Sequence, residues 1–566
     1  MNAPIRFIFR GQVVEAANTD PTRTLLQWLR EDARTLGGTL GGMLGGGTLG
    51  TKEGCNEGDC GACTVIVAEL EDGNVRLRTL NACIRFLPTL HGKALLTVED
   101  LSPAPPTDST QPPRLHPAQE ALVRCHGSQC GFCTPGFAMS LALSFERQRL
   151  QGRCASRAEL ADDLAGNLCR CTGYRPILDA AEQMGHGQED GYLPEGLALG
   201  PLQAQLEALR QDAPLDSPTW HAPRSLPELA ELRLAHPQAR LLAGGTDIGL
   251  WVNKQLRETG PLIHLGDVAE LRQLRREDTG LHIGAAVTLE DAWQALVQHW
   301  PSLSEIHRRF AGPPVRHAGT LVGNLANGSP IGDAAPVLMA LGAKLLLRRG
   351  TVQRELALDA FYVDYMQNRL EAGEFIEAVQ VPLTTVRGYP TVRPESTSTV
   401  RAELVEAPER GSPSTGSGRT EKTGSSAQTE KTNSAPTEEA GPWHIRAWKI
   451  SKRFDCDISA LSAGMAIQLD AAGVVTGVKL AFGGMAAVVK RAAGTEAALL
   501  GQPWNEATLE RALAALEADF TPLSDLRASA SYRRAAARGL LMRLWLETRP
   551  DQPLPAAQLR VFEGTV

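Results

Sequence analysis

Apolar and polar residues alternate in short runs near the start of the chain, as they do in half-buried strands. Two hairpins are predicted where such runs flank a short turn, Arg6–Arg10 with Val13–Ala16 and Thr64–Leu70 with Val75–Leu80. Asp20-Pro21 predicts a helix start, and the helix is expected to run to about Glu31. The first hundred residues are therefore expected to form a small β-rich unit.

The pattern becomes helical between Pro117 and Gln183, with predicted helices at Pro117–Arg124, Gly136–Arg149 and Arg157–Leu164. Beyond that region the chain alternates between the two patterns. We expect a helix at Leu202–Arg210, strands at Leu241–Ala243 and Lys344–Leu347, a hairpin-and-helix pattern from about Ile445, and a helix at Tyr532–Leu546. The predicted class is therefore α+β with several domains.

Two stretches lack any hydrophobic period. Residues 37–50 contain eight glycines, a composition that favours a flexible loop. Residues 391–441 contain no Phe, Trp or Tyr and are rich in Ser, Thr, Glu, Gly and Pro. Such a segment cannot bury enough apolar surface to offset its ordering entropy, so it is predicted to be a disordered insertion.

The chain has 566 residues, which suggests about three to five domains. The predicted division is 1–100, 101–184, a linker 185–217, 218–390, the insertion 391–441, and 442–566. Its formal charge of −7 argues against a nucleic-acid binder. No apolar run reaches the roughly 18 residues of a membrane span, and no secretory signal is visible. We expect a cytoplasmic protein that binds neither nucleic acid nor membrane.

Cysteine placement is the first indication of chemistry. Eight of the 11 cysteines form two groups of four: Cys55, Cys60, Cys63 and Cys83, and Cys130, Cys133, Cys169 and Cys171. In a reducing compartment, clusters at this spacing indicate metal binding rather than disulfides.

The first group has the spacing Cys55-x4-Cys60-x2-Cys63 with Cys83 further on, which is typical of a plant-type 2Fe–2S site. Glycines between these cysteines allow the backbone to approach a cluster closely. A structural zinc site is the alternative, because four thiolates also suit tetrahedral zinc. Zinc ligands usually come as two close couples, so the spacing favours iron and sulfur.

The second group consists of two couples, Cys130-x2-Cys133 and Cys169-x-Cys171, and its spacing alone suits zinc equally well. Cys133 precedes a predicted helix, whose N–H groups stabilise a thiolate. The presence of a ferredoxin-type site in the same chain favours a second cluster.

Two glycine-rich loops lie in the middle of the chain, Leu241–Asp247 and Gly319–Asn324, the second followed by Ser329–Asp333. Neither matches the G-x-G-x-x-G fingerprint of a dinucleotide fold. Together they are candidates to bind the pyrophosphate of a dinucleotide, but the pattern does not decide between them.

The chain resembles the iron–sulfur and flavin subunit of bacterial purine-oxidising enzymes in the molybdenum hydroxylase family. The matching segments are Gly50–Cys63, His126–Cys133, Gly166–Ile177, Gly323–Asp333 and Lys449–Ile458. The resemblance implies a ferredoxin-like β-grasp 2Fe–2S domain and a helical-bundle 2Fe–2S domain. It further implies an α/β FAD-binding domain of the PCMH/vanillyl-alcohol-oxidase type and a C-terminal α+β flavoprotein domain.

The same resemblance implies two 2Fe–2S clusters and one FAD. The second cysteine group would hold the cluster nearer molybdenum, the first group the cluster nearer the flavin, and Gln129 would contact the pterin across a subunit boundary. The implied FAD contacts are Leu241, Leu242, Ala243, Gly244, Gly245, Thr246, Asp247, Ile248, Phe310, Thr320, Leu321, Val322, Gly323, Asn324, Asp333, Ile376 and Lys449. Phe310 and Ile376 are alternatively core residues, and Lys449 a solvated charge.

The implied partner is a large subunit that binds the molybdopterin cofactor, in a heterotetramer of two small and two large subunits. Electrons from hypoxanthine and xanthine oxidation would pass through both clusters to FAD and then to NAD, with no catalytic residue for purine hydroxylation in this chain. The alternatives are an aldehyde- or CO-oxidising family member and a zinc-stapled flavin-binding protein. The family often has an acid where this chain has Cys456. Cys456 is either a buried structural thiol or a residue that alters the exchange of NAD at the flavin.

Overall fold

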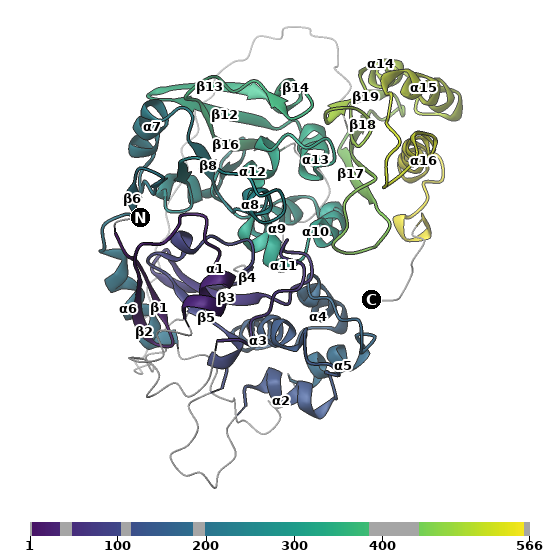
Figure 1. Ribbon diagram of the computed structural model, residues 1–566. Helices are drawn as coiled ribbons and strands as arrows, with labels where there is room; N and C mark the ends of the chain where they lie inside the picture. Colours follow the sequence, from purple (N-terminus) through teal and green to yellow (C-terminus); the bar gives the residue numbers. More distant parts are fainter. Residues whose placement is uncertain (1–2, 34–47, 103–114, 185–198, 384–440, 560–566) are drawn as a thin grey trace, which may run out of the picture.

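The computed structural model describes residues 3–33, 48–102, 115–184, 199–383 and 441–559 (Figure 1). The predicted mixed α and β multidomain class is confirmed. Residues 391–440 of the predicted insertion and 37–47 of the glycine-rich segment lie outside the described residues. No helix in the described ranges is both long and apolar enough to cross a membrane.

The first domain is built on a five-stranded sheet in the order β2-β1-β5-β3-β4. Its strands are β1 (Ile5–Phe9), β2 (Gln12–Ala16), β3 (Thr64–Glu71), β4 (Asn74–Asn81) and β5 (Ala94–Leu96). Both predicted hairpins are confirmed, because β1 pairs with β2 and β3 with β4 in antiparallel register. Asp72 and Gly73 both have positive φ, as the tight turn of the second hairpin requires.

The predicted helix start at Asp20-Pro21 is wrong. Helix α1 (Leu25–Gln27) begins after Thr24, which forms a capping box with Gln27, and it continues as a π-helical turn from Trp28 to Asp32. The Asp20 carboxylate instead accepts hydrogen bonds from the Thr22 N–H and hydroxyl, at 2.7 and 2.6 Å. Asp20 therefore closes a turn, and the stronger reciprocal cap later in the sequence sets the start of the helix.

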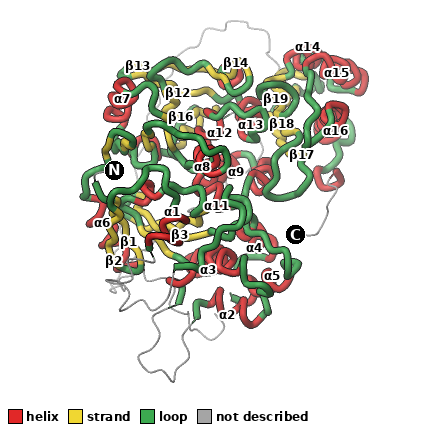
Figure 2. Tube along the Cα trace, viewed as in Figure 1, coloured by secondary structure: helices red, strands yellow, loops and turns green. Residues whose placement is uncertain are grey.

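The described part of the second domain contains the helices α2 (Pro117–Arg124), α3 (Thr134–Gln151), α4 (Arg157–Leu164) and α5 (Arg175–Gln183). The predicted bounds of α2 and α4 are confirmed. Phe137, Leu141 and Phe145 on α3 belong to the same buried cluster as Ile66 and Leu77 of the first domain's sheet. Figure 2 shows these helices grouped beneath that sheet. The two cysteine-bearing domains thus share one core.

Helix α6 (Leu199–Arg210) confirms the helix predicted within the segment 185–217. Leu206 and Leu209 are buried in the core shared by the first two domains. Gln205 donates to the Gly11 carbonyl at 2.9 Å and Gln203 to the Gly73 carbonyl at 3.1 Å, so α6 contacts both hairpin turns. This part of the segment covers the first domain instead of forming a free connection.

The third domain contains two main sheets. One has the order β6-β7-β9-β8, with β6 (Asp216–Ser217), β7 (Trp220–His221), β8 (Arg240–Leu242) and β9 (Leu262–His264). The other has the order β10-β11-β16-β12-β13, with β10 (Leu274–Arg276), β11 (Gly280–Gly284), β12 (Lys344–Arg349), β13 (Val352–Ala357) and β16 (Phe375–Pro382). A small hairpin adds β14 (Tyr362–Asp364) and β15 (Gln367–Asn368). The two predicted strands of this region are thereby confirmed to within a few residues.

Seven helices described in this domain pack with these sheets: α7 (Leu226–Ala235), α8 (Ile248–Asn253), α9 (Leu289–His299), α10 (Ser304–Phe310), α11 (Pro313–Ala318), α12 (Leu321–Ala326) and α13 (Ala334–Leu341). Every residue of α13 is buried, because this apolar helix lies against the sheet of the next domain. The backbone of Gly464 in that sheet approaches α13 so closely that a Cβ there would lie 2.2 Å from the Pro336 carbonyl oxygen.

The C-terminal domain lies beside the third domain in Figure 1. Its sheet has the order β17-β18-β19-β20, with β17 (Trp443–Ile450), β18 (Leu461–Leu469), β19 (Val475–Gly483) and β20 (Lys490–Arg491). The helices are α14 (Ala493–Leu499), α15 (Glu506–Asp519) and α16 (Ala530–Thr548). The predicted hairpin and the predicted final helix are confirmed.

Candidate cofactor sites

The first cysteine group converges on the end of the first domain's sheet. Cys63 and Cys83 are almost fully buried, and their Sγ atoms lie 3.3 Å apart. The backbone N–H of Cys60 donates to the Cys55 Sγ at 3.3 Å. Positive φ angles at Gly58 (82°) and Gly61 (70°) let the loop wrap around this centre.

The thiols of this group shift one another's pKa values. Contacts with Cys60 and Cys83 lower the pKa of Cys55, and a contact with Cys83 lowers the pKa of Cys63. The same contacts raise the pKa of Cys60 and of Cys83. Such crowding of thiols favours a bound cation, because metal ligation requires all four sulfurs as thiolates.

The second cysteine group lies at the ends of two helices and is more exposed. Cys133 is the N-cap residue of α3, as predicted, and Cys171 precedes α5. The Sγ atoms of Cys130 and Cys171 are 3.5 Å apart, and both residues are exposed. The Cys169 Sγ lies 3.2 Å from the Thr172 hydroxyl, a contact that lowers the pKa of Cys169 against the raising effect of burial. Gln129 is also exposed beside Cys130.

Within the described ranges, no three His, Cys, Asp or Glu side chains are gathered closely enough to hold a single metal ion. Two sulfur pairs lie close together, Cys63 with Cys83 at 3.3 Å and Cys130 with Cys171 at 3.5 Å. A 2Fe–2S centre takes four thiolates on two irons, so paired sulfurs are compatible with it.

Asn167 joins the two cysteine groups. Its Nδ2 donates to the Gly61 carbonyl at 3.1 Å and to the Thr64 hydroxyl at 3.2 Å, while its Oδ1 accepts from the Ser140 hydroxyl at 2.6 Å. The next residue, Leu168, donates its N–H to the Cys60 carbonyl at 2.9 Å. The backbone of one cysteine loop is therefore bonded directly to the loop of the other.

The two glycine-rich loops of the third domain lie against each other. A Cβ on Gly244 would lie 2.0 Å from the Ala318 carbonyl oxygen, so only glycine permits this approach. Thr320 caps α12 by accepting from the Gly323 N–H at 3.0 Å. The Oδ1 of Asn324 has no hydrogen-bond partner among the residues that the structure describes. The sequence left open which loop receives a pyrophosphate, whereas the structure forms a single cradle from both.

Asp333 and Lys449 form a buried ion pair between the third and fourth domains. The Lys449 Nζ lies 2.7 Å from the Asp333 Oδ2, and the Ser459 hydroxyl donates to Oδ1 at 2.6 Å. Both charged residues are less than a tenth exposed. Lys449 is therefore not the solvated charge of the alternative interpretation.

Phe310 and Ile376 both pack in or against the core of the third domain. Phe310 also lines a pocket of about 170 Å³ with Gly58, Gly166, Gly312 and Cys456, where all four domains meet. Burial raises the pKa of Cys456 to about 11, with further contributions from Asp455 and Asp59. Ile376, only 4% exposed, fits its core interpretation.

Helix α8 connects the glycine cradle to the first cysteine group. It begins directly after Asp247, and at its other end the Asn253 side chain donates to the Cys83 carbonyl at 2.7 Å. The Lys254 Nζ donates to the Cys55 carbonyl at 2.5 Å. Gly249 lies against Ile84, where a Cβ would be 2.7 Å from the carbonyl oxygen.

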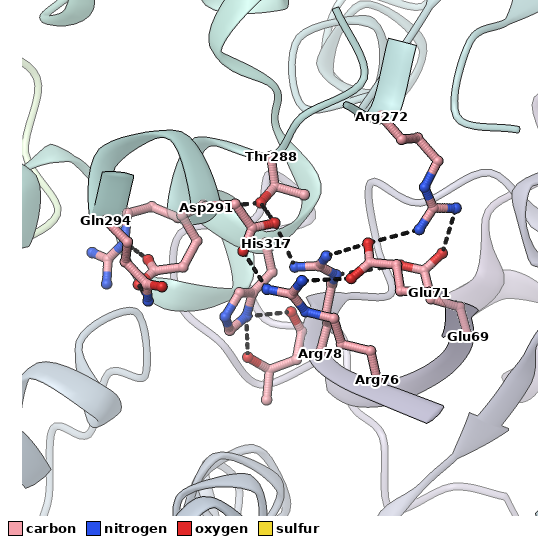
Figure 3. Close-up of polar contacts among 12 residues, drawn as sticks. Glu69, Glu71, Arg76, Arg78, Arg272, Thr288, Asp291, Gln294 and His317 are labelled. Atoms are coloured by element: carbon pink, nitrogen blue, oxygen red, sulfur yellow. Dashed lines mark hydrogen bonds and ion pairs between the residues drawn. The ribbon is translucent and has the colours of Figure 1, made fainter. Parts of the chain in front are cut away.

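An ion-pair network provides a second contact between the first and third domains (Figure 3). Arg78 on β4 lies 3.1 Å from Asp291 on α9 and 2.8 Å from Glu71, which also accepts from Arg272 at 2.7 Å. His317 contacts the Thr79 hydroxyl at 3.0 Å. Burial alone would raise the pKa of Asp291, but Arg78 and Arg76 outweigh it and lower the pKa, so the network is ionised at neutral pH.

Three protein-family models match the chain. Residues 97–182 match a [2Fe-2S] binding domain, residues 213–384 an FAD binding domain in molybdopterin dehydrogenase, and residues 446–548 a CO dehydrogenase flavoprotein C-terminal domain. The iron–sulfur and flavin cofactors predicted from the sequence are thereby confirmed.

The chain is also similar to proteins of known identity. Xanthine dehydrogenase of Emericella nidulans is 30% identical over 601 residues, covering 96% of this chain and 38% of that protein. Xanthine dehydrogenase/oxidase of Rattus norvegicus is 32% identical over 66% of this chain and 30% of its own length. A solved carbon monoxide dehydrogenase from Hydrogenophaga pseudoflava covers 59% of this chain and 96% of its own, with 23% identity and a TM-score of 0.45. The chain therefore spans only about two fifths of the length of the Emericella relative.

Sequence reasoning did not assign roles to Asn167, Asn253 or Lys254. Asn167 lies inside a segment that carries the family resemblance, and its position next to Cys169 was the available signal. Asn253 and Lys254 lie in an ordinary helical run, and their contacts with the cysteine loops come from more than 150 residues away in the chain.

Proposed function

Since the chain carries the iron–sulfur and flavin domains of the molybdenum hydroxylase family, we propose that it is the electron-transfer subunit of a xanthine dehydrogenase. The observation that carries this proposal is the similarity to xanthine dehydrogenase along 96% of the chain, in one continuous order of domains. A separate large subunit with the molybdopterin cofactor would supply the rest of the relatives' length.

In this proposal the more buried group, Cys55, Cys60, Cys63 and Cys83, holds the cluster next to the flavin. The second group, Cys130, Cys133, Cys169 and Cys171, of which Cys130 and Cys171 are exposed, holds the cluster that faces the partner, with Gln129 at the boundary. The clusters supply one-electron carriage and the flavin supplies exchange between one-electron and two-electron steps. The protein binds, spaces and shields these groups.

The glycine cradle of residues 241–248 and 320–324 is the proposed binding site of the FAD pyrophosphate. Asn324 offers an unpartnered side-chain oxygen there, and Asp333 is fixed by Lys449 and Ser459. Phe310 lines the pocket at which the first cluster loop meets the third domain. Ile376 supports this region from the core, and NAD is the proposed acceptor.

The first test is a visible absorption spectrum of the purified chain before and after anaerobic addition of NADH. We expect overlapping flavin and iron–sulfur bands that bleach together. Iron and acid-labile sulfide are assayed in the same sample. A zinc-containing chain without labile sulfide would contradict the proposal in favour of a zinc-stapled flavin-binding protein.

The substrate is tested on the complex assembled with the large subunit. We expect NAD reduction with hypoxanthine and xanthine and a mass that fits two small and two large subunits. Activity with an aldehyde or carbon monoxide but not with xanthine would contradict the purine assignment and leave the electron-transfer role intact.

A further inference from the structure

Arg85 lies between the first cysteine group and the glycine cradle. It follows Cys83 by two residues and is 9% exposed. Its Nη1 donates to the Gly244 carbonyl at 3.3 Å, within the first glycine-rich loop. Ile84, between Cys83 and Arg85, lies so close to Gly249 that a Cβ there would be 2.7 Å from the Ile84 carbonyl oxygen, and a Cβ on Gly245 would be 3.5 Å from it. The segment that carries a cluster ligand is therefore the support on which the flavin loop rests.

The Arg85 charge is not neutralised by an ion pair among the described residues. Its Nε has no hydrogen-bond partner in the described parts of the chain. The nearby carboxylates are Glu69 and Asp267, and both are engaged elsewhere: Glu69 pairs with Arg78, Lys93 and Arg272, and Asp267 with His264. Burying a guanidinium without a carboxylate lowers the free energy of unfolding. The fold therefore retains a positive charge at a position where an apolar side chain would be more stabilising.

We propose that Arg85 is a positioning residue for the flavin pyrophosphate. Its hydrogen bond fixes the Gly244 peptide in the cradle, and its positive charge lies behind the loop that receives two negative phosphates. A cation near an anion site raises affinity even without direct contact, because a buried charge is weakly screened. This inference rests on the proposed function, since it requires FAD in the cradle.

The proposal extends to the first cluster, because Arg85 is only two residues from the ligand Cys83. Reduction adds a negative charge to a cluster, and a nearby cation stabilises the reduced form. Arg85 therefore keeps the reduction potential of the buried cluster higher than it would be with a neutral residue. One side chain thus serves the two neighbouring redox groups.

The test compares three variants of the holoprotein: Arg85→Met, Arg85→Lys and the matched control Arg233→Met. Arg233 also donates to backbone carbonyls, Ala239 at 2.7 Å and Pro237 at 3.0 Å, and its Nε likewise lacks a partner. It lies on α7, which belongs to the same domain but forms neither the cradle nor a cysteine loop. FAD release is followed by flavin fluorescence on dilution, and the potential of each cluster by redox titration with electron paramagnetic resonance.

We expect Arg85→Met to weaken FAD binding about tenfold or more, as loss of a hydrogen bond from a charged group would. It should also lower the potential of the buried cluster only. Arg85→Lys should restore the potential and part of the affinity, because it keeps the charge. Arg233→Met should match the wild type in both measurements.

Wild-type FAD affinity and cluster potential in Arg85→Met would overturn the inference. Equal losses in Arg233→Met would also overturn it, since they would reflect general destabilisation. If Arg85→Met does not fold, Arg85→Gln takes its place, because it also removes the charge; wild-type FAD affinity and cluster potential in Arg85→Gln would overturn the inference. A wild-type chain that binds no FAD would instead refute the proposed function.

Discussion

The two cysteine groups differ in almost everything except their ligand chemistry. Cys63 and Cys83 are 2% and 1% exposed, and side chains from the third domain bond to the carbonyls of this group. Cys130 and Cys171 are exposed, beside the exposed ring of Phe132. The first group is contacted by side chains of this chain's third domain, whereas the second group has a solvent-exposed face at Cys130 and Cys171.

This difference gives an order to the proposed electron path. An exposed centre can exchange electrons with another subunit, and a buried one only with groups that the chain itself holds nearby. Asn167 and Leu168 supply the short backbone connection between them. The proposed route therefore enters at Cys130 and Cys171 and reaches the flavin cradle through Cys83 and α8.

The largest effect is expected when one cysteine ligand is replaced in each group and the two variants are compared. Cys63→Ser should remove the buried cluster and also reduce FAD content, because the loop that supports the cradle loses its centre. Cys171→Ser should remove only the exposed cluster and leave FAD bound. Iron, sulfide and flavin analysis of both variants checks this, and equal FAD loss in both would contradict the asymmetry.

Asn167→Ala should affect both groups at once. It removes two donated hydrogen bonds and leaves the Ser140 hydroxyl without its buried partner, so we expect a loss of about 2–3 kcal/mol in the free energy of unfolding. Urea denaturation followed by iron–sulfur absorbance measures it. Asn253→Ala is the comparison, because it weakens only the contact of the buried group with α8, and unchanged stability in Asn167→Ala would refute the coupling.

Mild acid should weaken the contact between the first and third domains, where His317 lies beside Thr79. Burial lowers the pKa of His317 to about 4, below its ordinary value of about 6.5, despite the raising effect of Glu290. Between these values the unfolded chain takes up a proton that the folded chain does not, so stability falls as pH falls. We expect a loss of about 1 kcal/mol between pH 7.5 and 5.5.

The matched variant for this effect is His317→Gln, which cannot titrate but still offers an amide to Thr79. Its denaturation midpoint should change less between the two pH values than that of the wild type. An identical pH dependence in both proteins would show that His317 is not responsible.

The smallest effect on stability is expected at the exposed face of the second cysteine group, where Gln129 lies. Gln129→Ala should change the stability of the chain by no more than about 0.5 kcal/mol, because the side chain is exposed. Flavin reduction by NADH should also stay at the wild-type rate. Electron transfer from xanthine in the assembled complex should slow, and an unchanged rate there would argue against a boundary role for Gln129.

Features that depend on residues close together in the sequence could be predicted. Cysteine spacing, the Asp72-Gly73 turn and the bounds of α2 and α4 are local, and all follow from short patterns. The start of α1 was misplaced because two capping signals compete within five residues, and the reciprocal capping box of Thr24 with Gln27 sets the start.

Contacts between distant segments were not predictable in this way. The approach of Gly244 to Ala318 and the bond from Arg85 to Gly244 join residues that no periodicity relates. Each glycine-rich loop is an ordinary turn on its own, and only the fold makes the two into one cradle. The candidate site was therefore predictable as a set of parts, but its assembly was not.

Helix α6 has a consequence for the order of events during synthesis. A nascent chain emerges from its N-terminus, and domains fold in that order. Both cysteine groups precede Leu199, so they have left the ribosome before α6 can place Leu206 and Leu209 over the shared core. The first two domains are thus not yet covered by α6 when all eight cysteines have left the ribosome. Helix α6 packs over them only as synthesis of the third domain begins.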